Sequence, residues 1–385
     1  MIRTLTANPS LDRTVALGAP LSAGGVHRIV QEATQVGGKG VNVARALHLA
    51  GAEVEALVPV GAEDPYRALL EDADAPVRTS SVAGAVRTNL TVLSPRESTA
   101  SESTGSTTSS GSAGSVGSIG SAEHPDAIGD PSGTVTTKLN EPGASISPAE
   151  LAALESALLT GSCSGAPGSP GGPHGHGAST DERSLAHTVM LSGSLAPGFP
   201  EDWYARMVRA LHERRAWVGV DTSDAPLRAL AAAWVEDPVC APDLLKPNAL
   251  ELAQLTGLDA AALDALERAG TDLDSAELGP VGESAQDLRA QGVAEVLVTL
   301  GGAGALLASA QGTWFCPAGP TRVVSTVGAG DCATAGFLLA RSRGEDAPTA
   351  LARAVAYGSA AVALPGTTIP RPDQVVARPD VVRAL

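Results

Sequence analysis

The sequence predicts an α/β fold, in which helices flank a mostly parallel sheet and a small antiparallel β lid accompanies it. Short apolar runs alternate with helical patterns along most of the chain, which is typical of a parallel sheet with helices on both faces. Glycine-rich and polar motifs follow the predicted strands, where ligands bind in such sheets. A second group of strand-like runs has no helices between its members. A chain of 385 residues is long enough for one large domain of this kind.

The period of the apolar residues predicts the individual elements of the large sheet. Its strands are expected over 2–6, 54–60, 188–191, 216–221 and 296–300. Its helices are expected over 40–49, 148–159, 201–212, 225–233, 249–255, 285–291, 332–339 and 349–364.

The runs without intervening helices predict the lid. They span 14–17, 26–33, 86–93 and 134–139. The lid segments, within a single domain of residues 1–385, are about 12–36, 84–96 and 134–143. Residues 97–133 are mostly Ser, Gly, Thr and Ala, and residues 161–184 are rich in Gly, Ser, Pro and His. Neither segment can bury enough apolar surface to fold, so we expect two disordered insertions.

The composition excludes several classes of partner. A net charge of −16 argues against nucleic acid or an anionic membrane surface as the main partner. No stretch approaches the roughly 20 apolar residues of a transmembrane helix. The N-terminal residues read as a strand and not as a leader, so we expect a cytoplasmic protein. The four cysteines are far apart in the sequence, which predicts neither a zinc site nor a disulfide framework.

The turn Ser325-Thr326-Val327-Gly328-Ala329-Gly330-Asp331 precedes an apolar helix and is the most informative motif. Small residues let the backbone approach a ligand, and the start of a helix offers unpaired N–H groups to an anion. A carboxylate beside such an anion site suits proton abstraction from a hydroxyl that attacks a phosphate. Because Asp is also a favoured helix N-cap residue, the motif alone leaves both interpretations of Asp331 open.

The second glycine motif, Gly37-Gly38-Lys39-Gly40-Val41-Asn42, opens a predicted helix. It lacks the spacing of a Walker A loop. Lys39 would strengthen an anion site, and Asn42 lies one turn further on, where it could hydrogen-bond a hydroxyl; the alternative is a surface glycine turn. Only three of the 26 basic residues are lysines, and each of the three lies in a polar or glycine-rich motif.

Three further residues could complete a site for a phosphorylated polyol. Asp12 follows the first strand and could accept hydrogen bonds from adjacent hydroxyls. Arg87 and Lys138 lie on lid strands and could close on a phosphate, although each alone would be a solvated charge.

Two motifs suggest a nucleotide and its metal ion. In Lys246-Pro247-Asn248-Ala249-Leu250-Glu251, the spacing of Asn248 and Glu251 fits a capping box. The same Glu251 could help to hold a hydrated Mg²⁺ ion, and the two roles can coexist. The run from Thr299 through Gly301 to Gly304 follows a strong strand and suits close passage of a nucleotide, but a β-turn between strands would look the same.

Together these motifs resemble the ribokinase-like sugar kinases of the pfkB family, and within it the kinases of fructose 1-phosphate. The segments that carry the resemblance are 6–14, 37–45, 87–89, 137–143, 192–195, 221–223, 246–251 and 325–331. It runs over nearly the whole chain apart from the two insertions. Asp224 departs from the pattern, because the family usually has glycine after Asp-Thr-Ser.

The resemblance implies transfer of a phosphoryl group from ATP, with Mg²⁺, to the 6-hydroxyl of fructose 1-phosphate. It implies Asp331 as the base and the backbone of Gly328, Ala329, Gly330 and Asp331 as the anion hole. The residues that it implies for the substrate are Asp12, Gly37, Gly38, Lys39, Asn42, Arg87, Lys138 and Asn140. Those that it implies for ATP are Ser223, Lys246, Thr299, Gly301, Gly304, Thr326, Gly328 and Gly330, with Asn248 and Glu251 for the metal ion. It also implies a homodimer formed through the lid.

Two alternatives remain open at this stage. A kinase of the same family could act on tagatose 6-phosphate or fructose 6-phosphate, because one lysine cannot fix the identity of the sugar. A non-catalytic sugar-phosphate sensor on the same fold is the alternative from another functional class.

Overall fold

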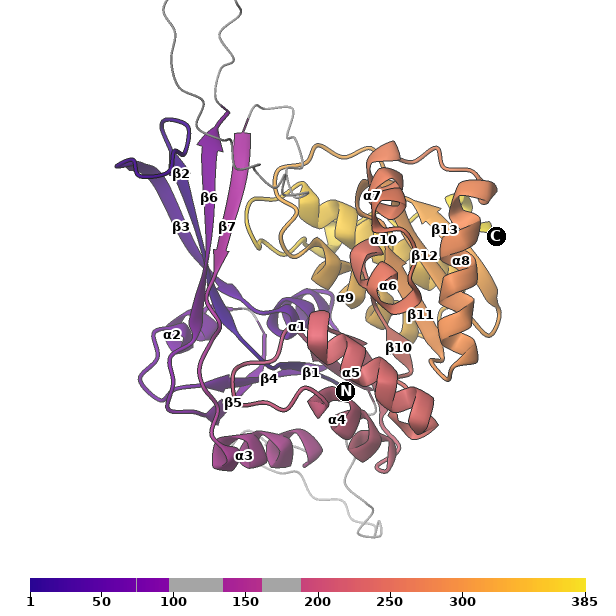
Figure 1. Cartoon of the computed structure of the whole chain (residues 1–385), viewed down its shortest axis with the longest axis horizontal. Coiled ribbons are helices and arrows are strands. Elements are labelled where there is room, and N and C mark those ends of the chain that lie inside the picture. The colour runs from indigo at the N-terminus through magenta and orange to yellow at the C-terminus, as the bar shows by residue number, and fades with distance from the viewer. Residues whose placement is uncertain (74, 97–133, 161–187) are drawn as a thin grey trace, which may run out of the picture. The chain divides into compact units, whose positions relative to one another are not determined.

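The computed structural model describes residues 1–73, 75–96, 134–160 and 188–385. Figure 1 shows the arrangement of their helices and strands. The chain divides into two compact units. The larger consists of Met1–Asp12, Gln35–Thr88 and Glu141–Leu385, and the smaller of Arg13–Thr34 and Asn89–Asn140. The insertions expected over 97–133 and 161–184 lie outside the described residues.

The larger unit is built on a ten-stranded sheet in the order β14-β13-β12-β11-β10-β9-β8-β1-β4-β5. Its strands are β1 (Ile2–Thr6), β4 (Val54–Val60), β5 (Val77–Ser81), β8 (Thr188–Ser192), β9 (Trp217–Asp221), β10 (Leu244–Leu245), β11 (Glu295–Thr299), β12 (Gly304–Ser309), β13 (Gly312–Pro317) and β14 (Arg383–Ala384). Neighbouring strands from β11 to β5 pair in parallel, whereas β11 to β14 pair antiparallel. The prediction of a mostly parallel sheet is therefore confirmed.

Helices cover both faces of this sheet (Figure 1). They are α1 (Lys39–Leu49), α2 (Tyr66–Glu71), α3 (Pro148–Leu159), α4 (Trp203–His212), α5 (Asp224–Glu236), α6 (Ala249–Thr256), α7 (Ala260–Ala269), α8 (Ser275–Ala290), α9 (Ala329–Ser342) and α10 (Ala347–Val362). Successive strand residues enter opposite cores. Val189 and Leu191 pack with α3, α4 and α5, whereas Met190 packs with α1 and α9. In the described parts of the chain, no helix has the length and apolar character that crossing a membrane requires.

A four-stranded sheet in the order β3-β2-β6-β7 accounts for the smaller unit. Its strands are β2 (Ser10–Leu17), β3 (Ile29–Gly37), β6 (Arg87–Pro95) and β7 (Thr134–Asn140). The β6–β7 ladder is antiparallel from the Asn89–Asn140 pair to the Pro95–Thr134 pair. Val15, Leu17 and Val92 form its small apolar cluster. These are the four strands that the sequence predicted without intervening helices.

Several elements were not predicted from the sequence. Strands β5, β12, β13 and β14 and helices α2 and α7 were missed. Helix α8 begins at Ser275 and not at residue 285, because Asp274 and Glu277 form a capping box there. The sequence did not predict this first part of the helix because it contains Gly279 and Pro280, and both residue types disfavour helix interiors.

Helix α1 lies directly against β1, and two glycines permit this close approach. Thr4 Oγ1 donates to the Gly40 carbonyl oxygen at 2.7 Å, and the Val41 N–H donates to Thr6 Oγ1 at 2.9 Å. A Cβ on Gly40 would lie 2.6 Å from the Leu5 carbonyl oxygen. Gly38 has a φ of +120°, which favours glycine. The start of α1, which carries Lys39 and Asn42, is thus fixed against the end of β1.

Gly40→Ala should lower the free energy of unfolding by about 1–3 kcal/mol, because the new methyl group would overpack against the β1 backbone. Gly282→Ala in α8 is the matched control, since a Cβ there would meet its nearest atom, Thr313 Cγ2, at an ordinary 3.5 Å. That control should not destabilise the protein, because Ala is the better helix former. Urea unfolding measures both values, and equal stability of the two variants would contradict the packing argument.

Candidate active site

The glycine turn at residues 325–331 leads into α9 and leaves two backbone N–H groups ahead of the first helical bond. Gly328 is the N-cap residue, with a φ of +78°, and no side chain caps the helix. The first helical bond runs from the Cys332 N–H to the Gly328 carbonyl oxygen at 2.9 Å. The Ala329 N–H makes a long 3.4 Å contact with the Thr326 carbonyl oxygen. The N–H groups of Gly330 and Asp331 therefore lie where an anion can be bound.

Asp331 lies inside the first turn of α9, so the interpretation of this residue as the N-cap is wrong. Its side chain is buried, and Oδ2 accepts a 2.8 Å hydrogen bond from Asn42 Nδ2. Burial and the nearby Asp221 carboxylate raise the pKa of Asp331 to about 6, although Lys39, Asn42 and Lys246 act in the opposite direction. A carboxylate with this pKa is ionised at neutral pH and more basic than an ordinary Asp.

Asn42 keeps one polar atom free. Its Oδ1 is buried and has no hydrogen-bond partner, while its Nδ2 is bonded to Asp331. Leaving a buried acceptor unsatisfied is unfavourable, so Asn42 Oδ1 can accept a hydrogen bond from a hydroxyl group of a ligand. The structure thus brings two predicted site residues, Asn42 and Asp331, into direct contact.

Asp221, at the end of β9, is the central charged residue and was not among the predicted site residues. Its side chain is 3% exposed, and its carboxylate is shared by two lysines. Lys39 Nζ lies 2.8 Å from Oδ1, and Lys246 Nζ lies 3.2 Å from Oδ2. The Lys246 side chain is only 5% exposed, whereas that of Lys39 is 37% exposed, so Lys39 can also reach a ligand. The sequence signals for Asp221 were its place at the end of a predicted strand and its membership of the segment 221–223 that carries the family resemblance.

The charges of this cluster stabilise one another. Burial raises the pKa of Asp221, but Lys246 and Lys39 outweigh this effect and hold it below its ordinary value. Burial lowers the pKa of Lys39, but the carboxylates of Asp221, Glu251 and Asp331 outweigh that effect and hold it above its ordinary value. Asp221 and Lys39, which form an ion triad with Lys246, are therefore both charged at neutral pH.

Asn248 and Glu251 form the capping box that the sequence suggested. Asn248 Oδ1 accepts from the Glu251 N–H, and Glu251 Oε2 accepts from the Asn248 N–H, both at 2.8 Å. Glu251 is buried, which raises the pKa of its carboxyl group, while Lys246 lowers it. Oε2 closes the cap, so Oε1 is the oxygen that could face a hydrated cation. Among the described residues, no group of three or more His, Cys, Asp and Glu side chains is arranged to hold a metal ion.

Thr299, Gly301 and Gly304 lie where β11 turns back into the antiparallel β12. Thr299 is bridged to Asn248, and residues Gly301–Ala303 form a short 3₁₀ turn. A Cβ on Gly304 would lie 2.1 Å from the Cys316 carbonyl oxygen, so packing against β13 alone requires this glycine. The turn between strands that the sequence left open is confirmed, and nucleotide binding there stays a prediction.

Asp12 and Gly37 also come together. A Cβ on Gly37 would lie 2.4 Å from both carboxylate oxygens of Asp12, so only glycine leaves room for this acid. Ser10 Oγ donates to Asp12 Oδ1 at 2.8 Å, and Tyr66 Oη donates to the Gly37 carbonyl oxygen at 2.6 Å. The Asp12 carboxylate thus packs against Gly37, in the glycine loop that precedes α1.

Arg87 lines a groove of about 420 Å³ in the larger unit. Asn8, Ser194 and Glu201 are its other polar residues. Arg87 Nε is buried without a hydrogen-bond partner, while Nη1 donates to the Glu141 carbonyl oxygen at 3.3 Å. Burial lowers the pKa of Arg87, and the Asp12 carboxylate raises it. The groove has the volume of a small-molecule site and holds a guanidinium with an unused donor.

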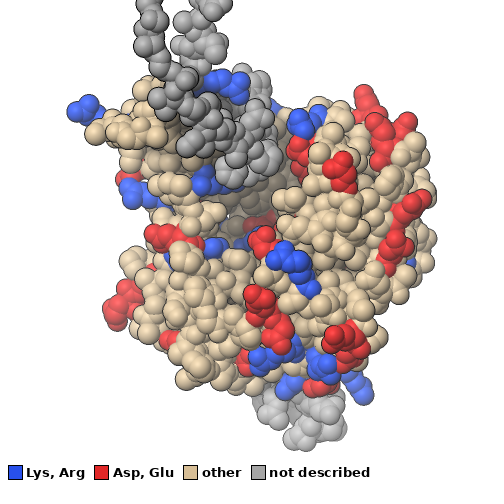
Figure 2. All heavy atoms as spheres, in the orientation of Figure 1, with Lys and Arg blue, Asp and Glu red and all other residues tan. Residues whose placement is uncertain are grey.

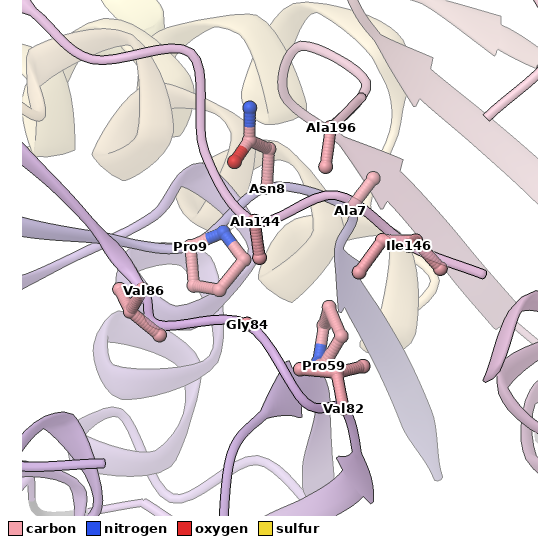
Figure 3. Close-up of a pocket in the computed structure, with 10 residues that line it drawn as sticks. All are labelled: Ala7, Asn8, Pro9, Pro59, Val82, Gly84, Val86, Ala144, Ile146 and Ala196. Atoms are coloured by element: carbon pink, nitrogen blue, oxygen red, sulfur yellow. The ribbon is translucent and has the colours of Figure 1, made fainter. Parts of the chain in front are cut away.

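Figure 3 shows a smaller cavity of about 10 Å³, which is lined mainly by apolar residues such as Pro9, Pro59, Val82 and Ile146. It has room for roughly one water molecule, so it is too small for a metabolite. Asn8 and Ala196 line both this cavity and the groove.

Three other predicted residues, Ser223, Lys138 and Asn140, are not members of the ion triad. Ser223 precedes α5, and its Oγ donates to Asp224 Oδ2 at 2.9 Å. Asp224 has a φ of +58°, which is a left-handed conformation in the position where the family pattern has glycine. The turn is therefore kept despite the substitution. Lys138 and Asn140 lie on β7 in the smaller unit, and their predicted roles remain predictions.

Figure 2 shows acidic and basic side chains interspersed on the displayed face of the molecule. Acidic side chains gather on the side of α7 and α8.

Comparisons with known proteins agree with the resemblance drawn from the motifs. The family model described as pfkB family carbohydrate kinase matches residues 178–374. A 1-phosphofructokinase from Xanthomonas campestris pv. campestris is 31% identical over 345 residues, which cover 88% of this chain and 83% of that protein. A D-tagatose-1-phosphate kinase from Klebsiella oxytoca is 32% identical over 171 residues, or 44% of this chain and 49% of that one.

Solved structures confirm the ribokinase-like fold. Phosphofructokinase-2 from Escherichia coli aligns with a TM-score of 0.69 at 24% identity, over 97% of this chain and 96% of that one. Ribokinase from Arabidopsis thaliana aligns with a TM-score of 0.61 at 17% identity, over 97% of this chain and 96% of that one.

Asp221→Asn should lower the free energy of unfolding by about 3 kcal/mol, because it leaves two ammonium groups, one of them buried, without their shared counter-charge. Glu32→Gln is the matched control, since Glu32 pairs with Arg13 at an exposed site. The control should change stability by no more than about 1 kcal/mol. Denaturant unfolding at pH 7 compares the two, and similar small losses would show that the triad contributes little to stability.

Proposed function

The chain belongs to the pfkB family of carbohydrate kinases, and from that premise we propose that it phosphorylates the 6-hydroxyl of fructose 1-phosphate. ATP would supply the phosphoryl group, and fructose 1,6-bisphosphate would be the product. The observation that carries the proposal is the buried Asp331 carboxylate, which lies at the start of α9 with a raised pKa and close to two lysines.

Asp331 would act as the general base. Asn42 holds its Oδ2, which leaves Oδ1 to accept the proton of the attacking hydroxyl. The N–H groups at the start of α9, in the segment Gly328–Asp331, would stabilise the charge on the transferring phosphoryl group. Proton acceptance and charge stabilisation would then come from the same helical turn.

The sugar phosphate would be held by residues on both sides of the glycine loop. Asp12, with Gly37 and Gly38 beside it, and the free Oδ1 of Asn42 would bind the hydroxyls. The partly exposed Lys39 and the unpaired Nε of Arg87 would bind the existing phosphate. Lys138 and Asn140, on β7, are also proposed for the substrate.

ATP would lie along the ends of β9, β10 and β11. Lys246, Ser223, Thr299, Gly301, Gly304 and Thr326 are the residues proposed for it, together with the backbone of Gly328 and Gly330. Two lysines and three carboxylates leave the cluster with an excess of negative charge when all are ionised, so a triphosphate would need a further cation. Asn248 and Glu251 would hold hydrated Mg²⁺, which neutralises phosphate charge when it is bound.

A homodimer through the lid is proposed as well. Ile29, Val30 and Leu139 on β3 and β7 are exposed apolar residues of the smaller sheet. Exposed apolar residues on a small sheet support an interface between subunits. One structure of Escherichia coli phosphofructokinase-2 is described as tetrameric, so self-association occurs in a structural neighbour.

The second candidate is a kinase for another ketohexose phosphate, as the sequence allowed for tagatose 6-phosphate and fructose 6-phosphate. The partial match to a D-tagatose-1-phosphate kinase keeps a tagatose phosphate among the candidates, with its phosphate on the same carbon as in fructose 1-phosphate. Tagatose and fructose differ in the configuration of one hydroxyl, whereas the two 6-phosphates also carry their phosphate at the other end of the sugar.

Coupled ATP turnover with fructose 1-phosphate, tagatose 6-phosphate and fructose 6-phosphate tests the proposal. We expect kcat/KM for fructose 1-phosphate to exceed the other two by at least about tenfold, because a misplaced phosphate loses charge-assisted hydrogen bonds. A higher kcat/KM for one of the other two sugar phosphates would contradict fructose 1-phosphate as the substrate and identify that sugar phosphate instead. No turnover with any of the three would contradict the proposed function.

The variant Asp331→Asn is the control, because it preserves the shape of the side chain and removes the base. Its kcat should fall by about 10²-fold or more, while calorimetry should still detect binding of the sugar phosphate. Near-normal kcat would refute Asp331 as the base.

A further inference from the structure

We propose that Glu267 on α7 selects the nucleotide by accepting a hydrogen bond from its nucleoside part, either from a ribose hydroxyl or from the adenine amino group. The inference rests on the proposed kinase function, with ATP along the turn from Thr299 to Gly304. It assigns a role to α7, an element that the motifs did not predict.

Glu267 lies against the bare backbone of the proposed nucleotide turn. A Cβ on Gly301 would lie 3.4 Å from Oε2 of Glu267, and a Cβ on Gly302 would lie 3.5 Å from the Glu267 carbonyl oxygen. Gly301 has a φ of +51°, a conformation that favours glycine. Since neither glycine has a side chain, the carboxylate and the exposed backbone of the turn border the same space.

The carboxylate of Glu267 is also linked to the start of α6. A hydrogen bond from the backbone of Ala249 lowers its pKa, although burial and Asp264 outweigh this effect and raise it. Ala249 follows Asn248, which is bridged to Thr299. Glu267 therefore lies between the start of α6 and the turn that follows β11.

Glu267 also keeps acceptor capacity. Within the described ranges it takes part in no salt bridge, whereas Asp264, one turn earlier, pairs with Arg268. An ionised carboxylate only accepts hydrogen bonds. The phosphates of a nucleotide offer no donors and would be repelled, so the nucleoside end, with its hydroxyl and amino donors, is the part that fits beside Glu267.

The test compares the wild-type enzyme with Glu267→Ala, using ATP, 2′-deoxyATP, 3′-deoxyATP and ITP at saturating sugar phosphate. ITP lacks the amino group and each deoxy analogue lacks one hydroxyl, so the set distinguishes the two donors. We expect the wild type to use at least one analogue about tenfold less efficiently than ATP, as judged by kcat/KM, because a hydrogen bond to a charged group is lost. In Glu267→Ala that ratio should shrink to about twofold or less.

Glu283→Ala on α8 is the matched control, because Glu283 is an exposed glutamate of a neighbouring helix. It should keep the wild-type ratios. A purely structural role of Glu267 would slow all four nucleotides alike and leave their ratios unchanged. Unchanged ratios in Glu267→Ala, with normal ATP turnover by the wild type, would overturn this inference alone. Absence of wild-type ATP turnover would instead contradict the proposed function.

Discussion

The site depends on one interaction, the sharing of the Asp221 carboxylate by Lys39 and Lys246. Burying a carboxylate costs several kcal/mol unless a partner compensates, and here two ammonium groups do so. The three residues come from the end of β9, the start of α1 and the segment after β10. Their ion triad therefore holds together elements that are far apart in the sequence. It places the start of α1 beside the C-terminal ends of β9 and β10.

The triad also controls the chemistry of its neighbour Asp331. Asp221 makes that carboxyl more basic, while the two lysines keep it ionised at neutral pH. Asn42 fixes its orientation through one oxygen. A base that is both ionised and more basic than an ordinary Asp suits removal of a hydroxyl proton in the neutral pH range. Stability and proposed catalysis thus depend on the same buried charges.

The sequence predicted much of this arrangement, and the failures have physical reasons. Apolar periodicity identified most of the parallel strands, although not β5, and the glycine motifs located Lys39, Asn42 and Asp331 at strand and helix ends. Asp221 was missed as a site residue because an acid at the end of a strand is common, and its partners are distant in sequence. Strands β12 to β14 were missed because the alternating pattern of strand and helix ends at β11. From the motif alone Asp331 could be the cap or the base, and the resemblance favoured the base; the structure places Gly328, and not Asp331, at the cap.

The most direct test of this account is the pKa of the Asp331 carboxyl group, measured by carbon-13 NMR titration of the ligand-free protein. Asp331→Asn identifies the signal. We expect a value of about 6 in the wild type. We expect a lower value in Asp221→Asn, because removing a nearby negative charge makes ionisation easier. An ordinary pKa of about 3.9 in the wild type, unaffected by Asp221→Asn, would contradict the account.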